Sequence, residues 1–291
     1  MIELDRFGLN RSAFPRIDIK GFFRLASRVG IHKVELRNDL TTGIIDSLSP
    51  QQAKDLAQKY SVRVITINRL PDFNAASLPE EFFRDLKDLL KLAVAINCEA
   101  IILVPTRSTS DPRGREQVFQ DTVKALKMLR PYFEGSGVFG YIETLGFADC
   151  SIRSVVDAMN AIRESGSTRY KIVYDTFHHF IGPDTAATLA RTFDTSHTAL
   201  VHISGVTVDA PPAQYNDGHR VMVGPGDKLD NIGQLALLDK LGYRGNVSFE
   251  PFSREIQEMD LARAEQMIRE SIKFVQNGTA RSVSALAQAG S

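Results

Sequence analysis

The stretch KIVYDTFH, residues 171–178, decides the fold of this chain. Its first four residues are mostly apolar and β-branched or aromatic, as expected of a short strand that helices enclose. The strand ends at the carboxylate of Asp175. In barrels of alternating strands and helices, functional groups lie at the C-terminal ends of the strands. The residues that end the other predicted strands are therefore the next candidates for a functional site.

Three other predicted strands carry chemically related residues at their ends. Glu143 closes FGYIE, His202 lies within LVHIS, and Glu250 closes VSFE. The four residues, Asp175 included, are separated by 32, 27 and 48 positions, and the first two intervals each match one strand-and-helix unit. The third interval is longer, and we expect its extra segment, residues 206–228, to form a flap over the site.

The whole chain repeats this unit. Short β-rich runs alternate with amphipathic windows whose apolar residues recur at three- and four-residue spacing, a pattern that predicts parallel strands joined by crossover helices. We expect the α/β class and a single (β/α)8 TIM barrel over residues 1–278, followed by a flexible C-terminal tail over residues 279–291. The expected strands cover residues 7–10, 33–37, 63–68, 100–105, 138–143, 171–175, 200–203 and 247–250. The expected helices cover residues 19–29, 50–60, 79–95, 114–132, 151–165, 183–193, 231–241 and 261–275.

Length, charge and cysteine content narrow the class of protein. The 291 residues would allow two domains, but no linker divides them, and one barrel of about 250 residues accounts for the length. Thirty-five Lys and Arg balance 35 Asp and Glu, so we expect no nucleic-acid partner and no membrane partner. Two cysteines are too few for a disulfide framework, and the first residues lack the basic start and apolar run of a signal peptide, so we expect a cytoplasmic protein.

The four strand-end residues form a set of metal donors. Three carboxylates beside one imidazole would repel one another if all were ionised, and a divalent cation is the simplest partner that neutralises them. Hard oxygen donors with one nitrogen suit Mn²⁺, Mg²⁺, Co²⁺ or Zn²⁺, whereas the lack of thiolates argues against a structural zinc site. Each carboxylate alone could equally be a helix cap or an ion-pair member, and His202 alone could be a core histidine with satisfied hydrogen bonds.

These motifs resemble the xylose isomerase-like barrels of the sugar phosphate isomerase/epimerase group, which includes the apurinic endonuclease branch. The resemblance covers nearly the whole chain and implies that Glu143, Asp175, His202 and Glu250 bind one divalent metal ion. The opening FGLNR and the string KVELRNDL look most like the inosose (2-keto-myo-inositol) isomerase branch. The other strong motifs are DTFH at 175–178, the stretch 220–227 that ends in GPGD, and GNVSFE at 245–250.

The resemblance implies a metal-dependent isomerase or epimerase of a polyhydroxy ketone, with 2-keto-myo-inositol as the first candidate. In related ketose epimerases two glutamates exchange protons with the substrate carbon from opposite faces, which gives Glu143 and Glu250 the catalytic roles. The reaction would pass through a metal-bound enediolate. The expected partner is therefore a small sugar or inositol-derived ketone, and the formation of a homo-oligomer stays open.

Two further residues match substrate contacts of the family. His178 lies three residues past Asp175, where the family carries a histidine that contacts substrate. Arg220 resembles the family arginine that precedes a Gly-x-Gly turn, and its guanidinium would bind a hydroxyl pair or a phosphate. The alternative for Arg220 is an ion pair with Asp217 or Asp227.

Residues at the ends of the second and third strands complete the expected site. Glu35 and Asn68 are expected to contact substrate from the same edge of the barrel, whereas the roles of Arg37 and Arg107 stay open. Each of these residues could instead form ion pairs or hydrogen bonds at the edge.

Other activities of the same barrel remain as alternatives. A dehydratase of an inosose or a dehydroshikimate-like substrate would use the same enediolate, and the sequence barely separates it from an isomerase. A ketohexose 3-epimerase is a further option. An apurinic endonuclease-type hydrolase would need additional histidines from the third and fourth strands, where this chain has none, and non-catalytic sugar binding is disfavoured because all four expected ligands are present.

Overall fold

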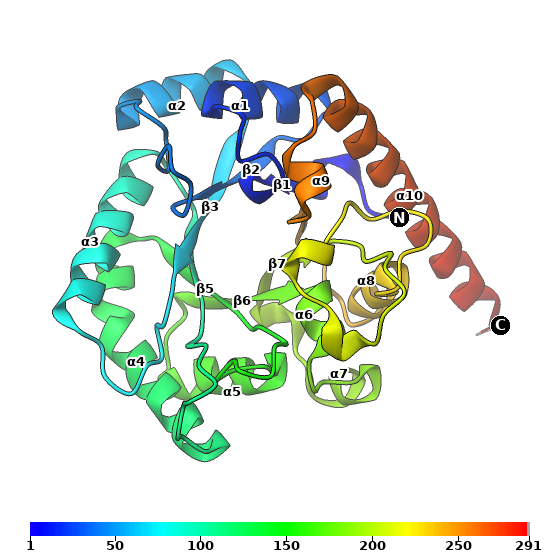
Figure 1. Ribbon diagram of the computed structural model, residues 1–291. Coiled ribbons are helices and arrows are strands. Elements are labelled where there is room, and N and C mark those ends of the chain that lie inside the picture. The colour runs from blue at the N-terminus through cyan, green and yellow to red at the C-terminus, as the bar shows by residue number, and fades with distance from the viewer. Residues whose placement is uncertain (290–291) are drawn as a thin grey trace.

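Eight parallel strands close into one barrel in the order β1 to β8, which confirms the expected fold (Figure 1). The computed structural model describes the backbone of residues 1–289 and the side chains of residues 1–281. Each strand pairs only with its neighbours along the chain, and β1 pairs with β8 to complete the closure. The strands are β1 Phe7–Asn10, β2 Lys33–Arg37, β3 Arg63–Leu70, β4 Ala100–Leu103, β5 Phe139–Glu143, β6 Tyr170–Asp175, β7 Thr198–Ile203 and β8 Asn246–Phe249.

Helices form a ring around the barrel, as Figure 1 shows. Local signals fix their starts; for example, Ser49 and Gln52 form a reciprocal capping box ahead of the helix that begins at Pro50. The helices are α1 Ile19–Arg28, α2 Pro50–Lys59, α3 Glu80–Ala95, α4 Arg115–Ser136, α5 Val155–Ser165, α6 Thr176–Ile181, α7 Ala186–Thr192, α8 Asn231–Lys240, α9 Arg254–Gln257 and α10 Leu261–Ala289. Short 3₁₀ turns occupy Leu4–Arg6, Arg11–Ala13, Thr195–His197, Pro212–Gln214 and Asp217–His219.

The C-terminal helix passes the expected domain boundary. Helix α10 runs to Ala289, and the hydroxyl of Thr279, which is buried, accepts a hydrogen bond from the backbone of Ile2. The chain is therefore helical where we expected a tail to begin. The flexibility of residues 279–291 stays a prediction, and residues 290 and 291 lie outside the described residues.

The barrel interior is divided into an apolar and a polar side. Alternate residues of a strand point inward, so a residue two positions before a strand-end residue shares its direction. On β4, β6 and β7 these inner positions are apolar, as Ile102, Val173 and Leu200 show, and they pack in one cluster. On β2, β3 and β8 the buried residues include Glu35, Thr66 and Ser248. Ser248 precedes Glu250 by two positions, so the polar side lies below that end of the site, and Glu35 reaches from it to the ring of His202.

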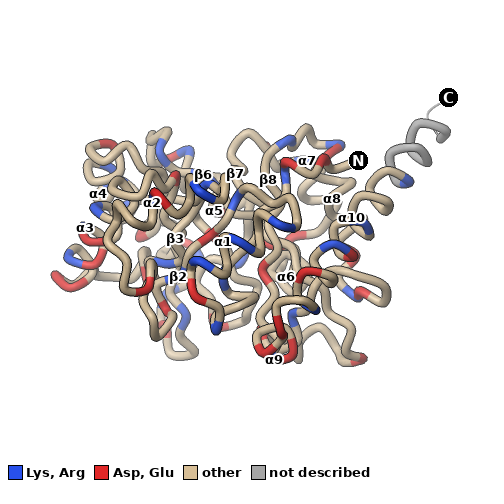
Figure 2. Tube along the Cα trace, turned by 90° about the horizontal axis from the view of Figure 1, so that it is seen from above, with Lys and Arg blue, Asp and Glu red and all other residues tan. Residues whose placement is uncertain are grey.

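Charged residues are spread over the molecule. In the view of Figure 2, Lys and Arg are interspersed with Asp and Glu along the tube. Both cysteines are buried and unpaired. Among the described residues, no helix combines the length and the apolar character needed to cross a membrane.

Candidate metal centre and active-site cavity

The four expected ligands meet at the C-terminal ends of their strands. Glu143 ends β5, Asp175 ends β6, His202 lies one residue before the end of β7, and Glu250 directly follows β8. The register pairs Asp175 with His202 across β6 and β7. All four side chains are buried, and each offers one donor atom within 4.8 Å of the donor atoms of the others. The closed barrel thus brings together residues that span more than 100 positions of sequence.

The imidazole of His202 joins the carboxylates through one nitrogen. Its Nδ1 lies 2.6 Å from Oε1 of Glu143, 3.1 Å from Oε2 of Glu250 and 4.0 Å from Oδ2 of Asp175. Its Nε2 lies 3.0 Å from Oε2 of Glu35. Because three carboxylate oxygens and one imidazole nitrogen converge from four strands, the donor set fits a divalent cation of the kind expected from the sequence.

The two glutamates of the cluster have unequal electrostatic surroundings. Burial and the charge of Glu250 raise the pKa of Glu143 to about 7. Burial acts in the same direction on Glu250, but the charges of His202, Arg220 and Arg37 hold the pKa of Glu250 well below its ordinary value. Near neutral pH, Glu250 is therefore a carboxylate, whereas Glu143 is close to its titration point.

Amide and guanidinium groups surround one oxygen of Glu250. Its Oε1 accepts hydrogen bonds from Nδ2 of Asn10 at 3.0 Å and Nδ2 of Asn68 at 3.2 Å, and Nη1 of Arg37 lies 3.4 Å away. Arg37 is itself held by two hydrogen bonds to Asp39. Sequence reasoning missed Asn10 as a site residue and left Arg37 open. The signal that could have found them is their position at the ends of β1 and β2, on the same edge as Glu250.

Arg220 ties the long loop after β7 to the cluster. Its Nη2 lies 2.6 Å from Oδ2 of Asp175 and 3.1 Å from Oε2 of Glu250, and its Nη1 lies 3.3 Å from Oδ1 of Asp217. The ion pair with Asp217, the alternative role that the sequence left open for Arg220, is therefore present. Asp227 has a different role, because its carboxylate accepts hydrogen bonds from backbone N–H groups of the loop. Arg220 is almost completely buried, and neighbouring carboxylates raise its pKa despite that burial.

Glu35 does not lie where a substrate contact was expected. Its side chain is fully buried beneath His202, and its carboxylate accepts hydrogen bonds from Thr66 and Ser248. It is not among the residues that line the cavity above the cluster, whereas Asn68 is. Glu35 precedes Arg37, the last residue of β2, by two positions, so it lies one layer below the cavity that Arg37 lines.

A cavity of about 240 Å³ opens directly above the cluster. It is smaller than the roughly 300–1,000 Å³ of sites for drug-sized ligands, so it suits a molecule of single-ring size. Polar groups of the cluster form its floor, and apolar side chains stand beside them. Its lining comprises Arg37, Asp39, Asn68, Arg69, Val104, Arg107, Glu143, Leu145, Phe147, His178, Asp217, Arg220, Glu250 and Phe252.

His178 is one of the residues that line this cavity. Its ring packs against the rings of Phe147 and Phe177, and its Nδ1 is buried without a hydrogen-bond partner among the described residues. Burial and the nearby charge of Arg220 lower the pKa of His178 to about 3, so the imidazole is neutral at physiological pH. A neutral imidazole with a free nitrogen can bind one hydroxyl or carbonyl oxygen of a ligand through that nitrogen when it carries the proton.

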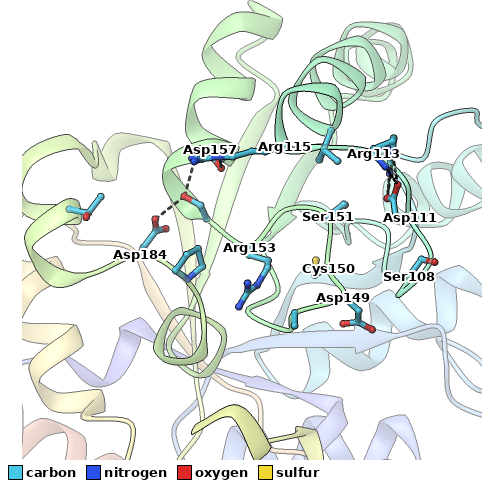
Figure 3. Close-up of a pocket in the computed structure, with 15 residues that line it drawn as sticks. Ser108, Asp111, Arg113, Arg115, Asp149, Cys150, Ser151, Arg153, Asp157 and Asp184 are labelled. Carbon is cyan, nitrogen blue, oxygen red and sulfur yellow. Dashed lines mark hydrogen bonds and ion pairs between the residues drawn. The ribbon is translucent and has the colours of Figure 1, made fainter.

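A second, larger cavity of about 490 Å³ lies over the N-termini of α4 and α5 (Figure 3). Its charged groups are already paired: Arg115 binds Asp157, Arg113 binds Asp111, and Asp184 accepts from Ser154. It therefore presents no group of converging free donors like the cluster, and the chemistry of the molecule is concentrated in the smaller cavity.

Comparison with known proteins agrees with this architecture. A family model described as the xylose isomerase-like TIM barrel matches residues 23–278. A xylose isomerase domain-containing protein from Salmonella typhimurium LT2 is 35% identical with a TM-score of 0.89, over 95% of this chain and 99% of that one. The structure of the IOLI protein with a bound zinc atom is 21% identical with a TM-score of 0.84, over 95% and 99% of the two chains. The inosose isomerase of Halalkalibacterium halodurans is 25% identical over 216 residues, which cover 73% of this chain and 75% of the relative. The expected family is thus confirmed, and the chain belongs to the xylose isomerase-like TIM barrel family.

Proposed function

We propose that this protein is a divalent-metal-dependent isomerase or epimerase of a small polyhydroxy ketone, with 2-keto-myo-inositol as the first candidate substrate. The observation that carries the proposal is the cluster of Glu143, Asp175, His202 and Glu250 beneath a cavity of single-ring size. Similarity to the inosose isomerase of Halalkalibacterium halodurans supports the choice of substrate, and the zinc in the IOLI protein supports the choice of metal.

The proposed ligands are the same four side chains. A divalent ion bound there would act as a Lewis acid that stabilises negative charge developing on a substrate oxygen. Mn²⁺, Mg²⁺, Co²⁺ and Zn²⁺ all accept this donor set.

The chain's own residues would bind the substrate and move its proton. Glu143 and Glu250 approach the cavity from β5 and β8, and in our proposal they remove and return the proton on the carbon next to the ketone. His178 and Asn68 line the same cavity and would hold substrate oxygens. Phe147 and Phe252 also line the cavity and would help to exclude water from the bound substrate.

Proton exchange in D₂O tests the proposal. The metal-loaded protein is incubated with 2-keto-myo-inositol and, separately, with ketohexoses, and NMR follows deuterium at the carbon next to the ketone while UV absorbance follows any enone. We expect deuterium uptake without an enone, and uptake at least 100-fold slower in Glu143→Gln, since general acid–base groups contribute about 10²–10⁴-fold. Asp175→Ala serves as the control that loses metal, and metal content is measured on every sample.

Three outcomes would contradict the proposal. An enone chromophore would identify a dehydratase, and the absence of exchange with every inosose and ketose would exclude chemistry next to a ketone. Wild-type exchange by Glu143→Gln with full metal content would remove Glu143 from the mechanism.

A further inference from the structure

A buried polar group lies beneath His202, on the side away from the cavity. It consists of Glu35 on β2, Thr66 on β3 and Ser248 on β8, and we call it the Glu35 relay. All three side chains are fully buried, at 0% exposure. A buried carboxylate is rare unless hydrogen-bond donors offset the cost of removing its charge from water. The donors around Glu35 therefore indicate its role.

The contacts of Glu35 converge on the imidazole of His202. Thr66 Oγ1 donates to Glu35 Oε2 at 2.6 Å, and Ser248 Oγ donates to Glu35 Oε1. Nε2 of His202 lies 3.0 Å from Glu35 Oε2. Two hydroxyls thus fix the carboxylate, and the fixed carboxylate meets the ring nitrogen that faces away from the metal cluster.

We propose that Glu35 is a positioning residue that sets the tautomer and the orientation of His202 for metal binding. With a metal ion on Nδ1, the imidazole of His202 would carry one proton, and the carboxylate of Glu35, which accepts hydrogen bonds, would hold that proton on Nε2. The lone pair is then on Nδ1, the nitrogen that lies among Glu143, Glu250 and Asp175. Carboxylates that hold a metal-bound histidine in this way raise the metal affinity of a site.

The backbone of β1 makes room for the relay. Gly8 is paired with Ser248 in the β1–β8 register. A Cβ on Gly8 would lie 2.8 Å from Ser248 Oγ and 3.0 Å from Ser248 Cβ, closer than ordinary contacts allow. Glycine at this position therefore lets Ser248 point inward and reach Glu35, which is an independent sign that the barrel is built around this contact.

Other roles for Glu35 do not fit its position. The imidazole ring separates it from the centre of the cluster, since it contacts the opposite ring nitrogen from the one that faces the carboxylates. It does not line the cavity, so it has no path to a substrate. Within the described part of the chain, the other hydrogen bonds of its carboxylate are to the hydroxyls of Thr66 and Ser248.

Zinc affinity of the full-length protein tests this inference, which rests on the metal site of the proposed function. Zinc alone is titrated in competition with a chromogenic chelator for the wild type, Glu35→Gln, Glu35→Ala and Gly8→Ala. We expect the dissociation constant to rise about 10- to 100-fold for Glu35→Ala, the range known for groups that support metal ligands. The rise should be smaller for Glu35→Gln and for Gly8→Ala, which keep the carboxylate's shape or the carboxylate itself. Glu99→Gln is the matched control. Glu99 directly precedes β4, at the end of the barrel opposite the metal cluster, and its carboxylate accepts a hydrogen bond from the hydroxyl of Tyr141.

An NMR signature separates positioning from loss of folding. In the wild type the Nε2–H proton of His202 should appear as a slowly exchanging, strongly deshielded resonance, and Glu35→Gln should shift it while the amide spectrum keeps the folded pattern. If both Glu35→Gln and Glu35→Ala bind zinc within twofold of a zinc-binding wild type, this inference alone is wrong. If the wild type binds no zinc, the proposed function fails and this inference with it.

Discussion

Two glutamates of one cluster differ because their neighbours differ. Oε1 of Glu250 accepts two amide hydrogen bonds, from Asn10 and Asn68, and faces Arg37, whereas the side chain of Glu143 is hydrogen-bonded to the ring of His202. Three donors on one oxygen fix the orientation of Glu250 and leave its Oε2 for Arg220 and the proposed metal. This arrangement predicts what happens when the carboxylate of Glu250 is replaced by the amide of glutamine.

Replacing Glu250 by glutamine should remove the metal rather than merely a base. The carbonyl oxygen of the new side chain would take the position next to the three donors, so its NH₂ group would point at the proposed metal. We expect Glu250→Gln to bind well below one equivalent of Mn²⁺ per chain, as determined by elemental analysis after gel filtration. A full equivalent would show that Glu250 is not a ligand.

The burial of His179 predicts that the free energy of unfolding falls in acid. Its Nδ1 is buried without a partner among the described residues, its ring lies against Tyr174, and burial lowers its pKa to about 4. An unfolded chain binds this proton near pH 6.5, so the unfolded state gains protons first and the native state loses stability as the pH falls below that value.

The variant His179→Phe should resist acid better than the wild type. Between about pH 7.5 and about pH 5, the free energy of unfolding of the wild type should fall by about 2 kcal/mol more than that of the variant. Urea unfolding at each pH measures the difference. Parallel curves for the two proteins would show that His179 is not held neutral.

For single residues, the sequence predicted which residue types lie near the site, but not how deep in the barrel each side chain lies. The four cluster residues were predicted because their chemistry recurs at strand ends. Glu35 was expected to face the cavity, but it precedes Arg37, the last residue of β2, by two positions and therefore lies one layer deeper, against His202. For Asp175, the sequence offered a cap or a ligand as alternatives, yet its Oδ1 accepts from the backbone of α6 while its Oδ2 faces the cluster.

Close backbone contacts between neighbouring elements help to position the side chains of the site. Gly146 follows β5, and a Cβ there would lie 2.2 Å from the backbone oxygen of His178 in α6. The loop after β5 therefore packs directly on the short helix that carries His178 to the cavity. The sequence did not predict α6, because its six residues are too few to show a helical period.

Gly146→Ala should disturb this packing. We expect a loss of about 1–3 kcal/mol in the free energy of unfolding, since overpacking forces the backbone apart, together with weaker substrate binding. Gly135→Ala is the control: Gly135 lies within α4 with open space around it, so alanine should stabilise the protein by about 0.5–1 kcal/mol. Equal stability of the two variants would contradict the predicted contact.

The loop from β7 to α8 is anchored at its centre. Arg220 binds the cluster, and backbone hydrogen bonds join Gly205 to Val221.

The expected flap over residues 206–228 stays a prediction, and hydrogen exchange tests it. A bound substrate analogue should slow exchange across the loop, and unchanged exchange would exclude closure.

For the molecule as a whole, the eight-fold alternation of strand and helix was enough to predict the barrel. Each strand lies within two residues of its expected range at its C-terminal end, where the periodicity was clearest. Closure of the barrel then forces the strand ends together, which is why residues far apart in sequence could be assigned to one site. The hydrogen-bond network beneath them depends on inward side-chain packing and could not be predicted in the same way.

Metal binding should stabilise the entire fold. A cation that binds only the native state raises the free energy of unfolding by about 4 kcal/mol at roughly 1,000 times its dissociation constant. We expect Mn²⁺ to raise the urea midpoint of the EDTA-treated wild type, because the ion offsets repulsion among buried carboxylates. Asp175→Ala should show little increase, and an equal increase would place the binding elsewhere.

The central claim is that one divalent ion binds at the ends of β5, β6, β7 and β8, and anomalous diffraction from zinc-soaked crystals tests it most directly. We predict one peak per chain, within about 2.3 Å of carboxylate oxygens and of the imidazole nitrogen Nδ1. The ligands should be Glu143, Asp175, His202 and Glu250. A peak at any other position, or no peak at a zinc concentration that saturates the protein in solution, would exclude this metal site.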